Sequence, residues 1–383
     1  MSNDIHTDPA RRHDFVLLFD VEDGNPNGDP DAGNLPRIDP ETMHGIITDV
    51  CLKRKVRDYL QITKGTPIFI QSETALNRLI SDAAAEVGVK QPQYSLEDEQ
   101  IIEWFQSESP ENFDLDGNIL TYLGESRKEK EIKKAFAKVE DKELKKKLND
   151  VATKLKESVD KDILTIEDRM STQKKMIEKY YDIRMFGAVL STGLNAGQVR
   201  GPLQVTFAKS VDPIFRLDNA ITRKAVTKEE DKKRKETEMA RKPTVPYALY
   251  VAYGFYNPYF ALKPKTNKDD PDQYTVSSDD LENLWEALEW MFNNDTAAAR
   301  GRMATKGLYI FSHDTKRGNA PSHKLFSRIR EEKREGKKNK DESARSYSDY
   351  KIHIDEEGLE ALNIKLKKLV HEEETLKGTT QND

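Results

Sequence analysis

The chain has 383 residues, of which 36% are hydrophobic and 34% are charged, so it can bury a sizeable core as one large or two ordinary domains beneath a strongly solvated surface. Its single cysteine, Cys51, excludes an intrachain disulfide, and no apolar run approaches the length of a membrane span. The N-terminal residues contain no apolar segment of the signal-peptide type. We therefore expect a cytoplasmic protein with no membrane partner.

The net charge of -6 is unevenly distributed along the chain. Residues 1–36 contain eight acidic residues and two arginines, so the remaining chain is neutral overall. Residues 191–260 contain twelve Lys or Arg against seven Asp or Glu, and residues 300–340 contain thirteen against four. Attraction to phosphate depends on charges within a Debye length of about 8 Å. These basic segments are therefore compatible with binding of a polyanion such as a nucleic acid, despite the negative net charge. A run such as 228–242 is equally typical of a solvated surface.

The first predicted element is a buried strand at residues 15–21 (FVLLFDV), a continuously apolar run that ends in acidic residues. Residues 22–36 are rich in Gly, Pro, Asn and Asp and are expected to form a loop. A helix is predicted from about Glu41 to Leu60, with Pro40 in its first turn. Its apolar stripe comprises Ile47, Val50, Val56 and Leu60.

Residues 76–165 are predicted to form a polar, helical insertion, because apolar residues mostly recur at spacings of three or four among many Lys and Glu. The pattern is typical of an amphipathic helix pair or an extended arm, and its drift argues against a regular coiled coil. The apolar residues of this pattern are Ile132, Phe136, Val139, Leu148, Val151, Leu155 and Val159.

The rest of the chain predicts a helix at 177–190, a glycine-rich loop at 192–202, a projecting basic insertion at 216–245 and a charged, mobile segment at 331–346. Further strands are predicted at 203–208, 247–256, 307–312 and 347–354, and a further helix at 281–292. Without its insertions, this order predicts an α+β core of the ferredoxin-like or RNA-recognition-motif kind. Such a fold does not by itself decide the function.

Basic residues gather on the helix that contains DVCLKRKVRDYL. Lys53 and Arg57 lie four residues apart and therefore share one helix face, while Arg54 and Lys55 broaden the charged surface. A helix that presents four cations can follow a phosphate backbone. The same pattern is also typical of an ordinary amphipathic surface helix.

Two other segments have features of a nucleic-acid contact. The 192–202 loop combines three glycines with Gln198 and Arg200, and glycine lets backbone amides approach phosphate oxygens. Taken alone, however, this loop is better explained as a long turn. The basic insertion mixes cations with apolar residues such as Phe215, which can contact phosphates, bases or a neighbouring subunit. A charged loop without a ligand is the alternative.

The sequence offers little support for a metal site or a catalytic centre. Asp23, Asn25 and Asn27 match the start of an EF-hand loop, but Asn34 replaces the glutamate at its twelfth position, so we expect a rigid turn. The chain contains neither H-E-x-x-H nor C-x-x-C. The His313–Asp314 dipeptide is more typical of a structural hydrogen bond than of a catalytic pair.

Five segments in order resemble the backbone subunit of the type I-C CRISPR Cascade, a Csd-type member of the RAMP superfamily. They are residues 15–60 (from FVLLFDVEDGNPNGDP to VRDYL), 182–193 (DIRMFGAVLSTG), 199–214 (VRGPLQVTFAKSVDPI), 220–227 (AITRKAVT) and 318–326 (GNAPSHKLF). The resemblance spans most of the chain, and its motifs are long and non-repetitive.

The resemblance implies a modified RNA-recognition-motif core with a protruding β-hairpin called the thumb. Copies of the chain would stack head to tail along a CRISPR RNA with other Cascade subunits, and the guide would pair with target DNA that another protein cuts. The chain itself would be no enzyme and would use no cofactor or metal. The residues expected to bind RNA are Lys53, Arg54, Lys55, Arg57, Arg37, Gln198, Arg200 and Lys209. Those expected in the thumb are Phe215, Arg216, Arg223, Lys224, Arg241 and Lys242.

On this basis we divide the chain into five segments. They are the first half of the core with the basic helix (1–75), the helical insertion (76–165), a core helix, glycine-rich loop and strand (166–213), the thumb (214–246), and the second half of the core with a charged C-terminal region (247–383).

Two other functions remain open at this point. The first is an endoribonuclease that processes CRISPR RNA, for which His44, His313 and the cluster around Asp20 are the candidate acid–base or metal-binding groups. The second is a scaffold protein that acts through the charged helix at 125–158 and binds no RNA.

Overall fold

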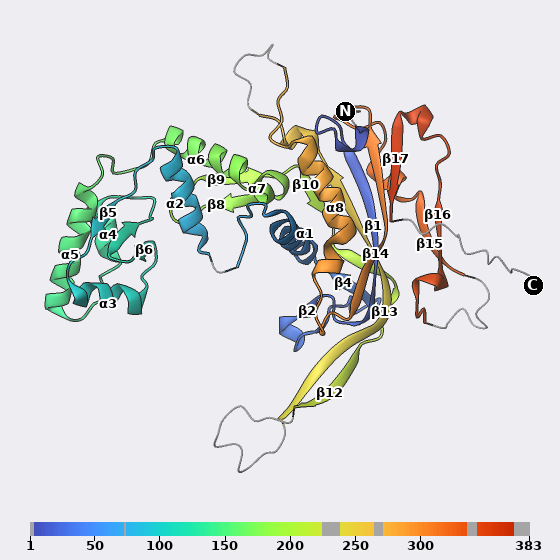
Figure 1. Ribbon diagram of the computed structural model, residues 1–383, viewed down its shortest axis with the longest axis horizontal. Helices are drawn as coiled ribbons and strands as arrows, with labels where there is room; N and C mark the ends of the chain where they lie inside the picture. Colours follow the sequence, from blue (N-terminus) through green and yellow to red (C-terminus); the bar gives the residue numbers. More distant parts are fainter. Residues whose placement is uncertain (1–3, 73, 224–237, 264–270, 335–342, 371–383) are drawn as a thin grey trace, which may run out of the picture. The chain divides into compact units, whose positions relative to one another are not determined.

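The computed structural model describes residues 4–72, 74–223, 238–263, 271–334 and 343–370 (Figure 1). The chain divides into two compact units. One comprises Met1–Gly65 and Pro202–Asp383 and is called the sheet unit below, and the other, Thr66–Gly201, is called the insertion unit. Among the described residues, no helix combines the length and the apolar character that crossing a membrane requires.

A twisted antiparallel sheet forms the centre of the sheet unit, and the fold is therefore α+β, as predicted. In spatial order, its main strands are β17 (Ile364–Leu369), β14 (Arg302–His313), β1 (His13–Gly24), β13 (Glu238–Tyr256), β11 (Ala208–Pro213) and β4 (His44–Ile47). The strands β10 (Leu203–Val205) and β12 (Leu217–Arg223) also pair with β13. The strands predicted at 15–21, 247–256 and 307–312 are confirmed, and each is longer than predicted.

Both faces of this sheet are covered, which explains the continuous apolar run in β1. The helices α1 (Asp49–Lys64) and α8 (Ser278–Asn294) lie on one side (Figure 1). There Phe15 meets Trp285 edge to face with ring centroids 5.3 Å apart, a favourable aromatic geometry. On the other face, alternate residues of β1 such as Val16 pack in a core with Leu325 and Tyr350. That cover is built from α9 (Ser322–Phe326), β15 (Ile329–Lys333) and β16 (Tyr350–Ile354).

The start of the basic helix differs from the prediction. Residues 44–47 form β4, in which Ile47 is buried opposite Ala208 of β11, so Ile47 is not part of a helical stripe. The helix begins after Thr48, whose hydroxyl accepts a hydrogen bond from the amide of Cys51, as an N-cap residue does. Val50 is largely exposed instead of anchoring the helix. Pairing of β4 with β11, a long-range contact, therefore decides where the helix begins.

The insertion unit is less helical than predicted, because it also contains a three-stranded antiparallel sheet in the order β5-β7-β6. The predicted apolar pattern is confirmed, since residues such as Ile132, Phe136 and Leu148 are fully buried in one core. The predicted division between residues 165 and 166 falls inside this compact unit. Its helices are α2 (Leu76–Glu86), α3 (Glu99–Glu108), α4 (Glu129–Lys134), α5 (Lys142–Glu157), α6 (Ile166–Lys179) and α7 (Tyr181–Phe186). Its strands are β5 (Gln93–Ser95), β6 (Phe113–Asp116), β7 (Ile119–Tyr122), β8 (Gly187–Leu190) and β9 (Gly197–Arg200).

Three further predictions need correction. The helix predicted at 177–190 spans the end of α6 and α7 and then gives way to β8 at Gly187, whose positive φ of 81° suits glycine. The predicted strand at 203–208 is split between β10 and β11. Of the segment predicted to be charged and mobile at 331–346, residues 331–333 lie in β15, and residues 335–342 lie outside the described residues. The remaining short elements are η1 (Ile5–Thr7), β2 (Gly28–Asp29), η2 (Pro30–Ala32), β3 (Leu35–Pro36), η4 (Pro258–Phe260), η5 (Tyr347–Asp349) and η6 (Glu360–Leu362).

A β-hairpin extends from the sheet at the position expected for the thumb (Figure 1). The strand β12 pairs with the first residues of β13, from Leu217 opposite Thr244 to Arg223 opposite Glu238. The same β13 strand continues into the centre of the sheet, where it pairs with β1. One long strand thus joins the projecting hairpin to the core.

Candidate nucleic-acid interface

A groove of about 640 Å³ lies in the sheet unit between the loop 25–37, the first half of α1 and residues 295–300. The first turn of α1 contributes Thr48, Val50 and Cys51 to its wall, so the partial positive charge of the helix N-terminus adds to the local field. Its charged lining residues are four cations and two acids, namely Arg37, Arg54, Lys55, Arg300, Asp58 and Asp295. This excess of positive charge makes the groove a candidate site for phosphate groups.

The amide side chain of Asn27 holds the loop against the start of α1. Its Oδ1 accepts hydrogen bonds from the backbone amide of Thr48 at 3.0 Å and from the Thr48 hydroxyl at 3.1 Å. Asn25 fixes the same loop from the other end, because its Nδ2 donates to the carbonyl of Asn34 at 2.7 Å. The residues that we expected to form a rigid turn thus also shape a groove wall.

Arg37 lies in this loop with only part of its guanidinium engaged. Its Nη1 is 3.3 Å from a carboxylate oxygen of Asp29, whereas its Nε is buried without a hydrogen-bond partner. A buried donor left unpaired costs about 1–3 kcal/mol. An oxygen atom of a ligand in the groove would remove that cost by accepting the hydrogen bond. Phosphate oxygens are strong acceptors for arginine.

The four cations of α1 occupy different environments. Arg54 is 44% exposed, lines the groove and pairs with Asp58 at 2.7 Å. Lys53 pairs with Asp49 at 2.8 Å, and neither Lys53 nor the half-buried Arg57 lines the groove. The prediction that the helix presents four cations at one surface is therefore corrected.

Lys55 is the clearest exception among these cations. Its side chain is only 3% exposed, and its ammonium forms an ion pair with Asp295. Asp295 also pairs with Arg300. Because the charge of Lys55 is matched inside the protein, Lys55 positions the wall of the groove and is not presented to solvent as a phosphate ligand.

The thumb hairpin is attached to the same loop and exposes a mixed surface. Arg216 donates from Nη1 to the carbonyl of Pro36 at 3.4 Å. On the hairpin, Arg241 is 80% exposed and pairs with Asp218 at 2.6 Å. Lys242 is half-buried opposite Asn219, Arg223 is placed only by its backbone in β12, and Lys224 lies outside the described residues. The exposed large apolar side chains of the hairpin region are Phe215, Leu217, Ile221 and Met239.

The other predicted RNA-binding residues lie elsewhere. Lys209 is exposed on β11, directly opposite Val251 of β13, and does not line the groove. Gln198 and Arg200 are exposed on β9 of the insertion unit. Residues 197–200 form a strand that pairs with β8, so the predicted glycine-rich loop is shorter than expected.

One of these glycines has a clear packing reason. A Cβ at Gly201 would lie 2.3 Å from the backbone nitrogen of Gly187 and 2.2 Å from the carbonyl carbon of Phe186. Glycine is therefore required at Gly201 by close backbone packing, a role separate from phosphate binding.

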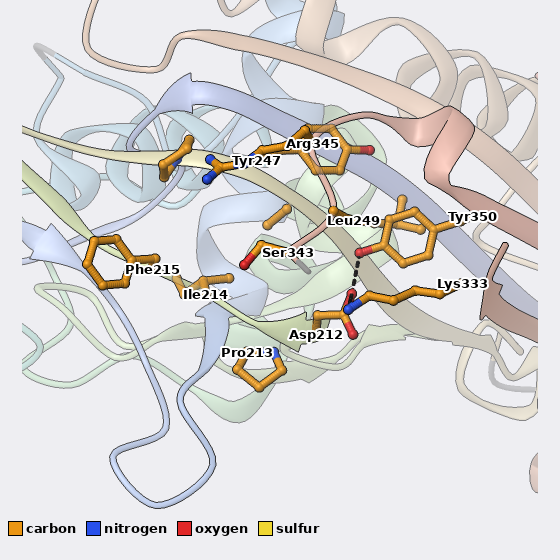
Figure 2. Close-up of a pocket in the computed structure, with 13 residues that line it drawn as sticks. Asp212, Pro213, Ile214, Phe215, Tyr247, Leu249, Lys333, Ser343, Arg345 and Tyr350 are labelled. Carbon is orange, nitrogen blue, oxygen red and sulfur yellow. Dashed lines mark hydrogen bonds and ion pairs between the residues drawn. The ribbon is translucent and has the colours of Figure 1, made fainter. Parts of the chain in front are cut away.

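The sheet face opposite the helices is not available to bases. Tyr247, Tyr309 and Phe311 of this face are buried in a core with the C-terminal cover. A small pocket of about 190 Å³ remains at the base of the hairpin. Figure 2 shows Tyr350 and Lys333 converging on Asp212 there, with the Tyr350 hydroxyl donating to Asp212 at 2.6 Å. These contacts fasten the cover to β11.

The candidate catalytic groups are buried or half-buried except Asp23 of the cluster around Asp20, which is exposed. His313 is fully buried, with its Nε2 3.0 Å from Asp14, and its Nδ1 accepts a hydrogen bond from the amide of Asn319 at 2.8 Å. Burial raises the pKa of Asp20, which accepts a hydrogen bond from the Tyr247 hydroxyl at 3.3 Å. His44 is half-buried in β4. In the described part of the chain, no group of three or more His, Cys, Asp or Glu is arranged to hold a metal ion.

Sequence reasoning missed several residues of the groove. The local pattern predicts a turn at Asn25 and Asn27 and a helix at Thr48. Their amide and hydroxyl groups connect segments that only the fold brings together. Arg300 belongs to the basic stretch 300–340, which was the signal that could have identified it. Its ion pair with Asp295 is local, but its place opposite α1 depends on the long-range contacts of Asp295 with Lys55 and of Ala299 with Asn25.

Comparison with known proteins identifies the family. The model of the family described as CRISPR-associated protein Cas7 matches residues 11–355. The chain therefore belongs to the CRISPR-associated Cas7 family. A CRISPR-associated protein Cas7 from Haloferax volcanii is 54% identical over 50 residues, which cover 13% of this chain and 15% of that protein.

Two solved structures are similar over most of their length at low sequence identity. A chain of a structure described as a CRISPR RNA-guided surveillance complex, pre-nicking, is 15% identical, with 78% of each chain covered and a TM-score of 0.38. A chain of a CRISPR RNA-guided surveillance complex is 11% identical, with 78% of this chain and 75% of that chain covered and a TM-score of 0.33.

Proposed function

We propose that this Cas7-family chain is the RNA-binding backbone subunit of a CRISPR RNA-guided surveillance complex, the Cascade of subtype I-C. In this proposal several copies bind one CRISPR RNA head to tail beside other Cascade subunits, and the guide pairs with target DNA in antiviral defence. The chain catalyses no reaction and acts in the cytoplasm. The main support is the groove beside α1, where Arg37 has an unpaired buried Nε and Arg54 and Arg300 lie partly exposed.

The groove suits an RNA whose sequence varies from one guide to the next. Its cations and the N-terminus of α1 favour phosphate oxygens, which are the same in every RNA. The burial of Tyr247, Tyr309 and Phe311 removes the sheet face on which an RNA-recognition motif stacks bases. Both observations favour binding to the phosphate backbone of the RNA over recognition of its bases.

The strand order supports the proposed RNA-recognition-motif core. In chain order, β1, α1, β11, β13, α8 and β14 follow the pattern β-α-β-β-α-β of a ferredoxin-like unit. In space, β1 lies between β14 and β13, and β11 lies on the far side of β13. The first strand is thus central and the two helices share one face, as that pattern requires. The insertion unit and the C-terminal cover are additions to it.

The hairpin supports the proposed head-to-tail contact. Its exposed Phe215, Ile221 and Met239 are apolar side chains without a cover in the described structure, and Arg241 adds charge beside them. A surface of this kind suits a neighbouring copy and the RNA bound to it. A contact between two different surfaces of identical copies builds an open filament, which fits assembly along a strand.

The two alternative functions lack comparable support. An endoribonuclease needs an acid and a base that reach the RNA, whereas His313 and Asp20 are buried. If the chain were a scaffold that binds no RNA, the buried Nε of Arg37 would have no ligand to accept its hydrogen bond. Neither alternative explains the groove.

The test is the nucleic-acid content of the protein purified with the partners of its operon. The proposal predicts an RNA of uniform length that holds several copies of the chain and stays intact during incubation. RNA-free protein would favour the scaffold, and RNA that shortens with time in the purified chain would favour the nuclease. Mass measurement of the intact particle gives the number of copies per RNA.

A further inference from the structure

Arg127 of the insertion unit is a buried arginine with no ion-pair partner among the described residues. Its side chain is 3% exposed, and burial lowers its pKa from the usual value. Its Nε has no hydrogen-bond partner, and Nη2 reaches only the Oε1 of Gln91 at 3.4 Å. Across the part of the chain that the structure describes, no carboxylate forms an ion pair with it, and the attraction of the more distant Asp168 raises its pKa less than burial lowers it. A buried charge of this kind is costly unless something compensates it.

A second unpaired donor lies beside it. The Nε2 of Gln91 is also buried without a hydrogen-bond partner, while its Oε1 faces Arg127. The backbone holds Arg127 in place, because its amide donates to the carbonyl of Asp162 at 2.9 Å and Ser126 forms a bridge with Ile163. A buried, unpaired donor on a fixed backbone, such as the Nε of Arg127, is typical of a site whose ligand supplies the acceptor.

Arg127 lines a cavity of about 170 Å³, several times the space of a water molecule (about 30 Å³). Lys90 and Lys161, both exposed, also line this cavity, so it opens to solvent and has three cations in its wall. The acids in its wall are Asp160, which is exposed, and Asp168. The carboxylate of Asp168 already accepts from the amide of Thr165 at 2.9 Å and pairs with Lys161 at 3.2 Å.

We propose that this cavity binds a phosphate group, with Arg127 donating to its oxygens and Lys90 and Lys161 adding charge at the rim. Gln91 does not line the cavity and would orient the guanidinium through its Oε1. A tetrahedral oxyanion matches the forked donors of arginine and neutralises the local excess of positive charge. The phosphate is either free in solution or part of a nucleic-acid strand that passes over the insertion unit. The site lies in the unit that does not contain the groove beside α1, and the inference does not depend on the function proposed for that groove.

Hydrogen exchange of the full-length protein tests the site locally. We expect 10 mM inorganic phosphate to slow exchange several-fold in peptides that cover residues 88–91, 126–128 and 159–163, relative to sodium chloride at matched ionic strength. A single-stranded oligonucleotide without a terminal phosphate forms the second arm. Protection by both probes identifies a backbone phosphodiester as an accepted ligand, and protection by inorganic phosphate alone identifies a free-phosphate site. Protection by neither, or equal protection by chloride, would overturn the proposal.

The variant Arg127→Met separates a ligand site from a structural role. We expect the variant to lose the phosphate-dependent protection while its Tm in phosphate-free buffer stays the same or rises, because an uncompensated buried charge has been removed. The matched control is Arg169→Met, since Arg169 in the same unit pairs with Glu125 and does not line the cavity. This control keeps the protection. A fall in Tm for Arg127→Met together with unchanged protection would mean that Arg127 is structural only.

Discussion

Asn27 and Thr48 are joined by two hydrogen bonds that end on the same amide oxygen, at 3.0 and 3.1 Å. One donor is the backbone amide of Thr48 and the other is its hydroxyl, which in turn accepts from the amide of Cys51 at 3.3 Å. The loop 25–37, the cap of α1 and the first turn of the helix therefore form one connected wall of the groove.

The variant Asn27→Ala removes both bonds. We expect the free energy of unfolding to fall by about 1–2 kcal/mol, because the amide of Thr48 loses its partner. RNA affinity should fall several-fold, because the loop that contains Arg37 is no longer fastened to the start of α1. Urea unfolding and fluorescence anisotropy measure the two effects. Asn118→Ala, which removes one exposed hydrogen bond to Ser95, is the control and should change stability by less than about 0.5 kcal/mol. Unchanged RNA binding in Asn27→Ala would show that this connection does not shape the binding surface.

Lys55 and Arg54 are neighbours in sequence with opposite expected roles. Lys55→Met leaves Asp295 with Arg300 as its remaining partner, and we expect a loss of about 1–3 kcal/mol of stability. Arg54→Met removes a more exposed ion pair and should cost no more than about 1 kcal/mol, yet weaken RNA binding. Denaturant unfolding and RNA titration of both variants provide the comparison. Equal stability losses in the two variants would contradict the assignment of Lys55 as a structural cation.

Two buried histidines, His6 and His13, predict that the free energy of unfolding depends on pH. The Nδ1 atoms of His6 and His13 lie 2.8 and 2.7 Å from the hydroxyl of Ser312, and His13 Nε2 lies 2.9 Å from the carbonyl of Asp8. With His13 Nε2 donating to that carbonyl, Ser312 donates to His13 and accepts from His6, so the ring of His13 is neutral. Burial lowers the pKa of each ring from 6.5 to about 4.

The sign of the pH effect follows from these lowered pKa values. Below pH 6.5 the unfolded histidines take up protons that the folded rings do not accept until about pH 4, so the free energy of unfolding falls between these limits. For His13 the loss is on the order of 3 kcal/mol. Urea unfolding of wild type and His13→Gln at pH 7, 6, 5 and 4 measures it, and the variant should show the weaker pH dependence. An identical dependence in both proteins would mean that His13 titrates normally.

Substitution of the exposed apolar residues of the hairpin is predicted to weaken the assembly of copies along RNA without changing the free energy of unfolding. Phe215→Ser and Met239→Ser should leave the free energy of unfolding within about 0.5 kcal/mol of wild type, because both side chains are largely exposed. We expect normal affinity for an RNA that accommodates one copy and reduced filling of a longer RNA, measured by particle mass. Ile62→Ser, an exposed apolar residue of α1, is the control. Full occupancy of long RNA by the hairpin variants would remove the hairpin from the proposed contact between copies.

The sequence predicted those elements whose local pattern is strong. The continuous apolar run at residues 15–21 is a strand buried on both faces, and the pattern that includes Ile132 and Leu148 marks a real core. The start of α1 was misplaced because Pro40 and Ile47 fit a helix locally, whereas pairing of β4 with β11 places Ile47 in a sheet.

The candidate site was less predictable because its geometry depends on distant contacts. Lys55 and Arg54 are indistinguishable by sequence pattern, yet a partner 240 residues away buries one of them. Likewise, nothing local indicates that Asn27 supports α1 or that Arg300 faces it. The predicted roles of Gln198, Arg200 and Lys209 in RNA binding stay predictions.

The most direct test of the central claim is the affinity of the groove for two RNAs of unrelated sequence, measured by fluorescence anisotropy at several salt concentrations. We predict that wild type binds both RNAs with similar affinity and that Arg37→Gln combined with Arg54→Gln weakens both by about tenfold or more. The slope of log affinity against log salt should fall by about 1.4, the value for two lost phosphate contacts on a single strand. Arg302→Gln, which removes an exposed arginine outside the groove, should bind like wild type. Equal affinity and an equal salt slope in the double variant and wild type would contradict the proposal that this groove holds the RNA.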